Sequence, residues 1–239
     1  GIGADGIILM EGSRKADAKM RMFNADGSEG SMAGNALRCM AKYLYDNGIV
    51  RKEEMTLETD KGTKTVRVYT TDGRVTSACV DMGYATLDTT ALRLNIPKRQ
   101  VVNYPVEIAG QPWEITCVDM GNPHCVVFCS RVDGVDVARI GPQFEHAPYF
   151  PDRINTEFIR VVNPSTIKMR VWERGSGETL ACGTGACAAV VAQVANGLCE
   201  KGRDITVRVQ GGDLVVHYTD EAVTLTGDAK LVYTGVVEY

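Results

Sequence analysis

Two stretches of this chain repeat one pattern, and this repeat constrains the fold more than any other feature of the sequence. Residues 173–185 read ERGSGETLACGTG, and residues 24–36 read NADGSEGSMAGNA. Placing Ala33 opposite Cys182 gives an offset of 182 − 33 = 149 residues. The other positions that then coincide are Glu29 with Glu178, Gly34 with Gly183 and Gly48 with Gly197. A repeat of this kind predicts one supersecondary unit built twice, with a thiol in one copy and a methyl group in the other.

The length and charge of the chain limit its class. Its 239 residues suffice for one large domain or two small ones. The net charge is −4 with both signs interspersed, so there is no basic stripe for nucleic acid and no polybasic arm for a membrane surface. The longest apolar run, 186–195, is too short to span a bilayer, and no secretory signal is visible. We expect a cytoplasmic protein with no nucleic-acid partner and no membrane association.

The eight cysteines indicate a reduced protein rather than a disulfide framework. Such frameworks belong to short secreted domains, and this chain is much longer. The pairs Cys125–Cys129 and Cys182–Cys187 lack a second matching pair or a suitably spaced His. We therefore expect no metal site.

Each copy of the repeat predicts a strand, a turn, a helix and then three strands. The turns are rich in Gly and Ser, and an Asn-Gly pair that suits a left-handed cap follows each helix. In the first copy the expected elements are a strand at 19–23, a helix at 34–46 and strands at 55–59, 65–70 and 75–82. In the second copy they are strands at 113–119, 125–129 and 168–172, a helix at 183–195 and strands at 205–210, 214–218 and 222–226.

These elements predict an α+β fold with two pseudo-symmetric halves, each a mostly antiparallel sheet or barrel wrapped around a central helix. We assign residues 1–87 plus 229–239 to the N-terminal half and residues 88–228 to the C-terminal half. The second copy begins near residue 105, which maps to 105 − 149 = −44 in the first. We therefore expect that about 45 residues of the first copy, including its opening strands, are missing before Gly1.

The start of the second helix carries groups suited to proton transfer. The first amides of a helix have no partner within the helix and that end is partly positive, so a carboxylate binds there readily. The same positive end is expected to lower the pKa of the Cys182 thiol, and the adjacent glycines let a ligand approach the backbone. Two such helix starts around one carboxylate would place an acid/base group on each side of the neighbouring carbon. In a purely structural alternative, the small residues permit close packing and Cys182 is an inert apolar residue.

Three motifs resemble those of the diaminopimelate epimerase family, and the resemblance covers essentially the whole chain. They are FNADGSE at 23–29, MGNPHC at 120–125 and ERGSGETLACGTGAC at 173–187. The resemblance implies two similar halves with the active site between them. It also implies a two-thiol epimerisation of LL-diaminopimelate to the meso form, without a cofactor or a metal, in lysine and peptidoglycan synthesis. Diaminopimelate is then the expected small-molecule partner, and a homodimer is an assembly that this interpretation allows.

The resemblance also implies roles for individual residues. Cys182 is similar to the second catalytic thiol, and Ala33 occupies the place of the first. Glu173 would hold the reacting amino group, and His124 would line the site. The residues that would offer backbone amides to the reacting carboxylate are Gly34, Asn35, Gly183 and Thr184. Those that would recognise the distal amino acid end are Asn24, Asn122, Asn155 and Arg174.

Each of these roles competes with a simpler one. Asn24 precedes Asp-Gly and Asn122 precedes Pro, and both positions are natural turn formers. Arg174 would then be a solvated surface residue, and His124 a core histidine with its hydrogen bonds satisfied. The residue pattern alone leaves these alternatives open.

Ala33 decides what the chain as written can do. It has no proton to give or take, so a two-thiol mechanism cannot run and we expect an inactive or nearly inactive protein. Cys39 lies six residues further on, about one and two-thirds helical turns away, and would not substitute. One hypothesis is a cysteine-to-alanine form of a diaminopimelate epimerase. The others are a natural, non-catalytic amino-acid-binding relative and a racemase of a different amino acid.

Overall fold

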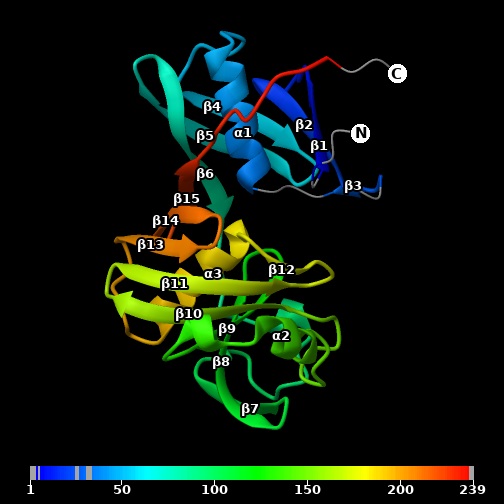
Figure 1. Ribbon diagram of the computed structural model, residues 1–239, viewed down its shortest axis with the longest axis vertical. Coiled ribbons are helices and arrows are strands. Elements are labelled where there is room, and N and C mark those ends of the chain that lie inside the picture. The colour runs from blue at the N-terminus through cyan, green and yellow to red at the C-terminus, as the bar shows by residue number, and fades with distance from the viewer. Residues whose placement is uncertain (1–3, 5, 25–26, 31–33, 237–239) are drawn as a thin grey trace. The chain divides into compact units, whose positions relative to one another are not determined.

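The computed structural model describes residue 4 and residues 6–24, 27–30 and 34–236 of the chain. The chain forms two compact units (Figure 1). Unit 1 comprises residues 1–81 and 226–239, and unit 2 comprises residues 82–225. The divisions fall six and three residues before the expected boundaries at 87/88 and 228/229 (87 − 81 = 6; 228 − 225 = 3).

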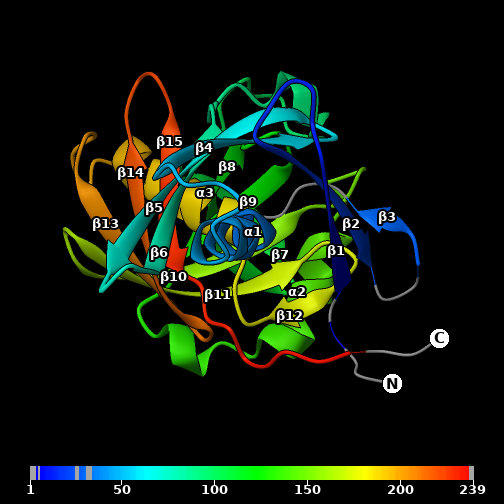
Figure 2. The same cartoon turned by 90° about the horizontal axis from the view of Figure 1, so that it is seen from above.

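Unit 1 is a sheet with one helix. Its elements are β1 (Gly6–Glu11), β2 (Ala18–Asn24), β3 (Glu29–Gly30), α1 (Gly34–Asp46), β4 (Glu54–Thr59), β5 (Gly62–Thr71) and β6 (Arg74–Gly83), the last of which runs into unit 2. The strands pair in the order β1-β2-β4-β5-β6, and β3 pairs with β2. β2 and β4 run parallel because the chain crosses over between them through α1. The pairs β1–β2, β2–β3, β4–β5 and β5–β6 are antiparallel. Figure 2 shows α1 end-on, and the helix contacts β5.

Unit 2 repeats this arrangement and extends it. Its elements are the 3₁₀ turns η1 (Thr90–Leu92) and η2 (Val132–Gly134), the helices α2 (Val137–Glu145) and α3 (Gly183–Ala195), and the strands β7 (Tyr104–Ile108), β8 (Gln111–Asp119), β9 (Pro123–Phe128), β10 (Asn155–Asn163), β11 (Thr166–Glu173), β12 (Gly177–Thr179), β13 (Asp204–Val209), β14 (Gly212–Tyr218) and β15 (Val223–Asp228). The strand order is β15-β14-β13-β11-β10-β9-β8-β7, with β12 on β11. β15 begins in unit 2 and ends in unit 1.

The core of unit 2 lies on both sides of its sheet. α3 is buried along most of its length and contacts β8, β9, β10 and β14. α2 packs against β11 and β12, and Phe144 of α2 meets Trp113 and Phe158 edge to face, with each pair of ring centroids 5.4 Å apart. Burial of such large aromatic side chains is a main stabilising term for a domain of this size.

Both repeat helices begin and end at the residues predicted from the sequence. Each ends at an Asn-Gly pair in which the glycine has a left-handed backbone, with φ of +67° at Gly48 and +69° at Gly197. The amide of Gly48 donates to Tyr45, and the amide of Gly197 donates to Val194, so carbonyls of the last turn are satisfied. The predicted three strands after each helix are also confirmed.

The 149-residue offset relates the two units element by element. It carries β1 onto residues 155–160 at the start of β10, and α1 onto α3 (34 + 149 = 183; 46 + 149 = 195). It also carries the ion pair Arg21–Glu29 onto Arg170–Glu178, and both pairs have an N–O distance of 2.8 Å. The predicted fold class, α+β with two pseudo-symmetric halves, is therefore confirmed.

One expectation about the first copy is wrong. The sequence reading placed no strand before residue 19, but β1 occupies residues 6–11 and pairs antiparallel with β2. Its counterpart β10 was also missed, and it is β10, not β9, that pairs with β11. Within the described residues, the segment from β7 to α2 has no counterpart in unit 1.

Candidate active site

Cys182 lies at the start of α3 and serves as its N-cap. Its backbone is extended (φ −133°, ψ 115°), and its Sγ accepts a hydrogen bond from the Gly185 amide at 3.3 Å. The Thr184 hydroxyl lies 3.6 Å from Sγ, and the Cys182 residue is only 7% exposed. The sulfur thus occupies the place where a Ser or Asp side chain commonly caps a helix.

Glu173 is the last residue of β11 and faces this thiol. Its Oε1 accepts a hydrogen bond from the Thr179 hydroxyl of β12 at 2.5 Å. β11 and β12 pair through Glu173 and Gly177, so the tight turn between them holds both side chains in place. A half-buried carboxylate beside a buried thiol is an arrangement suited to binding an ammonium group next to an acid/base residue.

A line of buried and half-buried polar groups connects the thiol to β9 and β10. The Asn122 amide nitrogen donates to the Thr184 hydroxyl at 3.3 Å, and Asn122 Oδ1 lies 3.0 Å from His124 Nε2. On its other side, His124 Nδ1 lies 2.7 Å from Glu157 Oε1. His124 and Glu157 side chains are both fully buried. Asn122 and His124 therefore lie with Cys182 and Thr184 in one cluster.

Asn155 and Arg174 meet at the edge of this cluster. Asn155 donates to the Pro123 carbonyl at 2.8 Å, and its Oδ1 accepts from the Arg174 amide at 2.9 Å. The Arg174 side chain is exposed, and its Nη1 donates to the Asp152 carbonyl at 3.2 Å. Asn155 thereby ties the start of β9 to the turn that carries Arg174.

The pKa of the Cys182 thiol moves opposite to the expected direction. Burial raises this pKa, and the nearby Glu173 and Glu157 carboxylates raise it further. The hydrogen bonds from Thr184 and from the Gly185 amide lower it, but they do not outweigh burial and like charge. The prediction of a thiol pKa lowered by the helix end is therefore wrong, and Cys182 is a protonated thiol, ready to donate, at neutral pH. Burial also raises the pKa of the Glu173 carboxyl.

In unit 1 the structure describes some of the predicted residues and not others. Asn24 closes a turn: its amide donates to the Ser28 carbonyl at 2.8 Å, and its side chain donates to Ser28 Oγ at 3.1 Å. Gly34 and Asn35 begin α1, and Asn35 Oδ1 accepts from Arg38 at 2.9 Å. Ala33 lies outside the described residues.

Three residues of these clusters are not predicted by the sequence motifs. Glu157 is a fully buried residue of β10, Thr179 is the last residue of the short strand β12, and Arg38 is a buried cation on α1. The sequence signal for Glu157 is weak, because polar residues precede it, and the signal for Arg38 is its place one turn after Gly34-Asn35.

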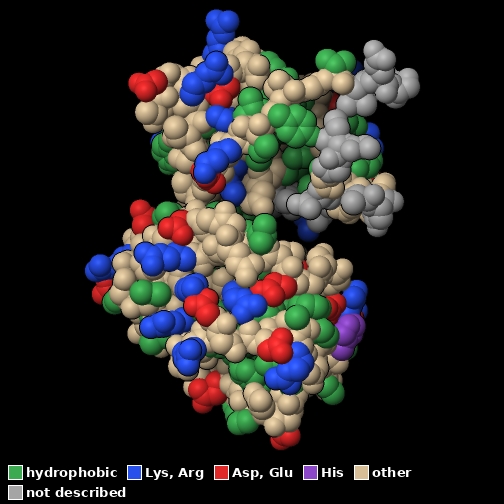
Figure 3. Space-filling view, in the orientation of Figure 1, with side chains coloured by type: hydrophobic (Ala, Val, Ile, Leu, Met, Phe, Trp, Pro, Cys, Tyr) green, Lys and Arg blue, Asp and Glu red, His purple; other side chains and the backbone are tan. Residues whose placement is uncertain are grey.

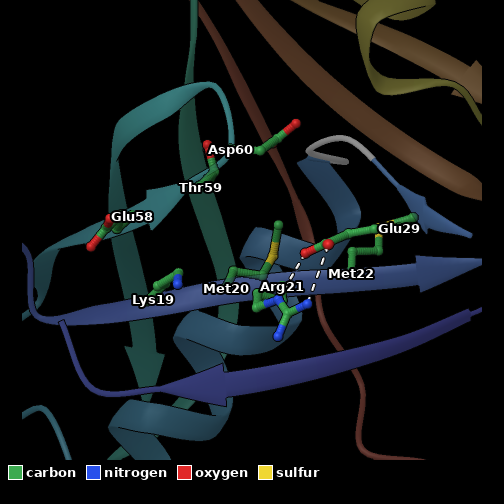
Figure 4. A pocket seen from close by; sticks show the side chains of 8 residues that line it. All are labelled: Lys19, Met20, Arg21, Met22, Glu29, Glu58, Thr59 and Asp60. Carbon is green, nitrogen blue, oxygen red and sulfur yellow. Dashed lines mark hydrogen bonds and ion pairs between the residues drawn. The ribbon is translucent and has the colours of Figure 1, made fainter.

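Two pockets, one in each unit, lie elsewhere. The pocket in unit 1 has a volume of about 210 Å³. Figure 4 shows its lining, in which Arg21 of β2 is bonded to Glu29 of β3 and to which Glu58 and Thr59 of β4 also contribute. A second pocket, of about 590 Å³, lies in unit 2 between β8, η2 and α2. None of the predicted site residues lines either of them.

Within the described part of the chain, two kinds of feature are absent. No group of three or more His, Cys, Asp or Glu side chains there could hold a metal ion. No helix there is long and apolar enough to cross a membrane. Figure 3 shows acidic and basic side chains interspersed on the face in view, which accords with the charge pattern of the sequence.

Comparison with known proteins identifies the family. The profile described as diaminopimelate epimerase matches residues 1–87 and 116–232. The chain belongs to the diaminopimelate epimerase family. This is a family of isomerases, and the resemblance found in the three sequence motifs is thereby confirmed.

Curated members of the diaminopimelate epimerase family are similar over nearly the whole chain. The diaminopimelate epimerase of Desulfovibrio desulfuricans is 50% identical over 244 residues, covering 98% of this chain and 84% of that protein. That of Acetivibrio thermocellus is 48% identical over 240 residues, covering 100% of this chain and 85% of that protein.

Solved structures at low identity share the fold of the family. A probable proline racemase from Agrobacterium radiobacter gives a TM-score of 0.67 at 16% identity, covering 93% of this chain and 73% of that one. A hydroxyproline epimerase from Agrobacterium vitis, with trans-4-hydroxy-L-proline bound, gives 0.68 at 15% identity, covering 95% and 74%.

Proposed function

We propose that this chain carries the diaminopimelate site of an epimerase that converts LL-diaminopimelate to meso-diaminopimelate without a cofactor, a step of lysine biosynthesis. The assignment of this substrate is supported by the relatives, which are named diaminopimelate epimerase. The observation that carries the chemistry is the buried Cys182 thiol, which caps α3 and faces the Glu173 carboxylate. That pair offers a proton donor beside a partner for an ammonium group, as inversion of an α-amino acid requires.

The other predicted residues take the roles expected from the sequence. The amides at Gly183 and Thr184, and at Gly34 and Asn35 of the first copy, would stabilise negative charge on the reacting carboxylate. The residues proposed to hold the distal amino acid end are Asn24, Asn122, Asn155 and Arg174. The exposed guanidinium of Arg174 supports this role, because it donates to a backbone carbonyl and forms no ion pair with the described residues. The Asn122 amide is engaged by His124 and Thr184, so a bond to substrate would have to share or replace one of these.

We propose further that the chain as written is inactive or nearly so. Inversion breaks the α-carbon–hydrogen bond on one face, where a thiolate takes the proton, and forms a new bond on the other, where a thiol gives one. Cys182 supplies one of these groups. Ala33 occupies the repeat position of the other and can neither accept nor donate a proton.

Restoring the second thiol tests this function. The Ala33→Cys variant should epimerise diaminopimelate about 10²–10⁴-fold faster than the parent chain, the gain typical of one acid/base group. Chiral chromatography of the two stereoisomers measures inversion, and deuterium uptake from D₂O measures exchange at the α-carbon. Sedimentation of the same preparations measures whether the chain forms the homodimer that the family resemblance allows.

Two controls bracket the result. Ala33→Ser places a hydroxyl oxygen on the same carbon that carries sulfur in cysteine. Because it supplies no thiol, this variant should remain as slow as the parent. Cys182→Ala in the restored chain should remove the gain. Binding of diaminopimelate by calorimetry without turnover in the restored chain would instead indicate a non-catalytic binding protein. Preference for a monocarboxylic amino acid would indicate a racemase of another substrate.

A further inference from the structure

Glu157 is a fully buried carboxylate that the proposed reaction does not use. It lies on β10, two residues after Asn155, and its exposed fraction is 0%. One oxygen, Oε1, lies 2.7 Å from His124 Nδ1, whereas Oε2 has no hydrogen-bond partner among the described residues. A buried carboxylate costs free energy unless it is paired, so its presence in the buried part of a strand calls for a specific role.

The contacts of Glu157 lead directly to the thiol. His124, held at Nδ1 by Glu157, meets Asn122 Oδ1 with its other nitrogen at 3.0 Å. Asn122 in turn donates to Thr184 at 3.3 Å, and the Thr184 hydroxyl lies 3.6 Å from Cys182 Sγ. Four contacts therefore connect β10, β9 and the first turn of α3. A carboxylate bonded to one imidazole nitrogen fixes the ring orientation and its tautomer.

Gly185 brings the same carboxylate close to the helix start. A Cβ at this position would lie 2.5 Å from Glu157 Oε1 and 3.2 Å from Cys182 Sγ. Only a residue without a side chain leaves Glu157 this room. The carboxylate therefore lies beside the partly positive end of α3, which offsets part of the cost of burying it.

We propose that Glu157 is a positioning residue, whose carboxylate holds the His124 ring and, through Asn122 and Thr184, fixes the Cys182 thiol at the start of α3. The inference rests on the proposed function only in taking Cys182 as the reacting group. Nothing in the repeat suggests this role, because position 8, the counterpart of Glu157 in the first copy, is Ile8 (157 − 149 = 8).

Glu157 also contributes to the raised pKa of this thiol, after burial and Glu173. The ionisable groups that face Cys182 are Glu173 from β11, Glu157 from β10 and, behind Asn122, His124 from β9; its own helix contributes the polar Thr184. Burial raises the pKa of Cys182 most, followed by the charges of Glu173 and Glu157. Removing the charge of Glu157 should therefore lower the thiol pKa and increase the thiolate fraction at a given pH.

The test is the alkylation rate of Cys182 in the chain as it stands. Iodoacetamide modification, followed by peptide mass spectrometry across about pH 7–10, reports the thiolate fraction, which rises tenfold for each unit of lowered pKa. In Glu157→Gln, Cys182 should react several-fold faster at each pH. Cys187, also buried on α3, is the internal reference and should keep its parent rate. The proposal would be overturned if Cys182 in Glu157→Gln reacted at the same rate as in the parent. It would also be overturned if Cys187 were accelerated equally, because that would indicate a general loosening of the fold.

A matched control and a second measurement complete the test. Glu145→Gln removes another buried carboxylate of unit 2, one that bonds Trp172, Gly175 and Arg153, and should leave the Cys182 rate unchanged. If Glu157→Gln does not fold, an NMR measurement on the parent chain tests the proposal instead. Its His124, one of three histidines, should show an Nδ1–H proton protected from solvent exchange in NMR spectra, and its absence would refute the contact. Neither measurement needs catalytic turnover. Both can therefore be interpreted even if the proposed epimerase reaction is not observed.

Discussion

Residue 185 is the point at which the packing of α3 and the chemistry of the thiol compete for the same space. A side chain there would meet Glu157 Oε1 at 2.5 Å and both Cβ and Sγ of Cys182 at 3.2 Å. The sequence reading attributed the glycines of this turn to the approach of a ligand. The structure gives Gly185 an additional reason, which is the approach of a buried carboxylate from the same chain.

Gly185→Ala should therefore destabilise the protein although Ala favours helices. Overpacking against a fixed carboxylate costs about 1–3 kcal/mol, which exceeds the gain of up to about 1 kcal/mol in helix propensity. Urea unfolding measures the difference. Gly134→Ala is the control, because its Cβ would meet nothing closer than Arg131 Cβ at 3.8 Å. Equal stability of the two variants would contradict the steric argument.

At the scale of single residues, the sequence predicted which side chains lie near Cys182 better than it predicted the pKa of the thiol. The cluster of Cys182, Asn122, His124 and Thr184 follows from motifs that local patterns reveal. The direction of the thiol pKa could not follow from them, because it depends first on burial, then on the charge of Glu173, and then on Glu157, which arrives from a strand 25 residues away in sequence (182 − 157 = 25). The effect of a helix end on a thiol pKa is local and can be predicted from the sequence, whereas the effect of desolvation depends on the assembled core.

The C-terminal end of α1 is anchored to the start of β6 by one carboxylate. Asp46 Oδ1 accepts from the Val75 amide at 2.9 Å, and Oδ2 pairs with Lys42 Nζ at 2.8 Å. Lys42 also donates to the Val75 carbonyl at 2.5 Å. Burial alone would raise the pKa of Asp46, but the bonds to Lys42 and Val75 prevail and lower it.

Asp46→Asn should destabilise unit 1 by about 1–2 kcal/mol at neutral pH, because a charge-assisted pair becomes a neutral one. A carboxyl with a lowered folded pKa adds stability above its unfolded pKa and loses it as the pH falls through the folded value. The difference between parent and variant should therefore shrink below about pH 4. Urea unfolding at neutral and acid pH measures it, with the exposed Asp60→Asn as the control. A difference that persists at acid pH would exclude the ion pair as its cause.

Among the elements, those with strong local signals were predicted and those without were not. Helices α1 and α3 end at Asn-Gly pairs, which fix their limits. Helix α2 is only nine residues long and contains Pro142, so it gave no clear helical pattern. Strand β10 pairs in parallel with β9 across a long connection, and non-local pairing of this kind leaves little trace in the local sequence.

Unit 2 is continuous in sequence, whereas unit 1 is not. Residues 82–225 form one stretch with its own aromatic core, and unit 1 is completed by residues 226–239. Within unit 1, the buried Arg38 of α1 donates to the carbonyl of Asp228 at 3.3 Å, so the returning segment contacts the helix.

A fragment of residues 82–225 should therefore fold alone. We expect native-like circular dichroism and one cooperative urea transition, as for most single domains of this length. Residues 1–81 alone should show no cooperative transition, since they lack the returning segment. Non-cooperative unfolding of the 82–225 fragment would mean that its core depends on residues outside it.

The interrupted path of unit 1 also has a consequence for biosynthesis. A ribosome releases the chain from its N-terminus, and domains commonly fold in that order. Here the first 81 residues emerge before the partner segment that completes their unit, whereas unit 2 has all of its residues once position 225 has left the exit tunnel. The nascent chain thus holds an incomplete N-terminal sheet while the middle of the protein folds, and an incomplete sheet with unpaired strand edges is the kind of species that chaperones protect from aggregation.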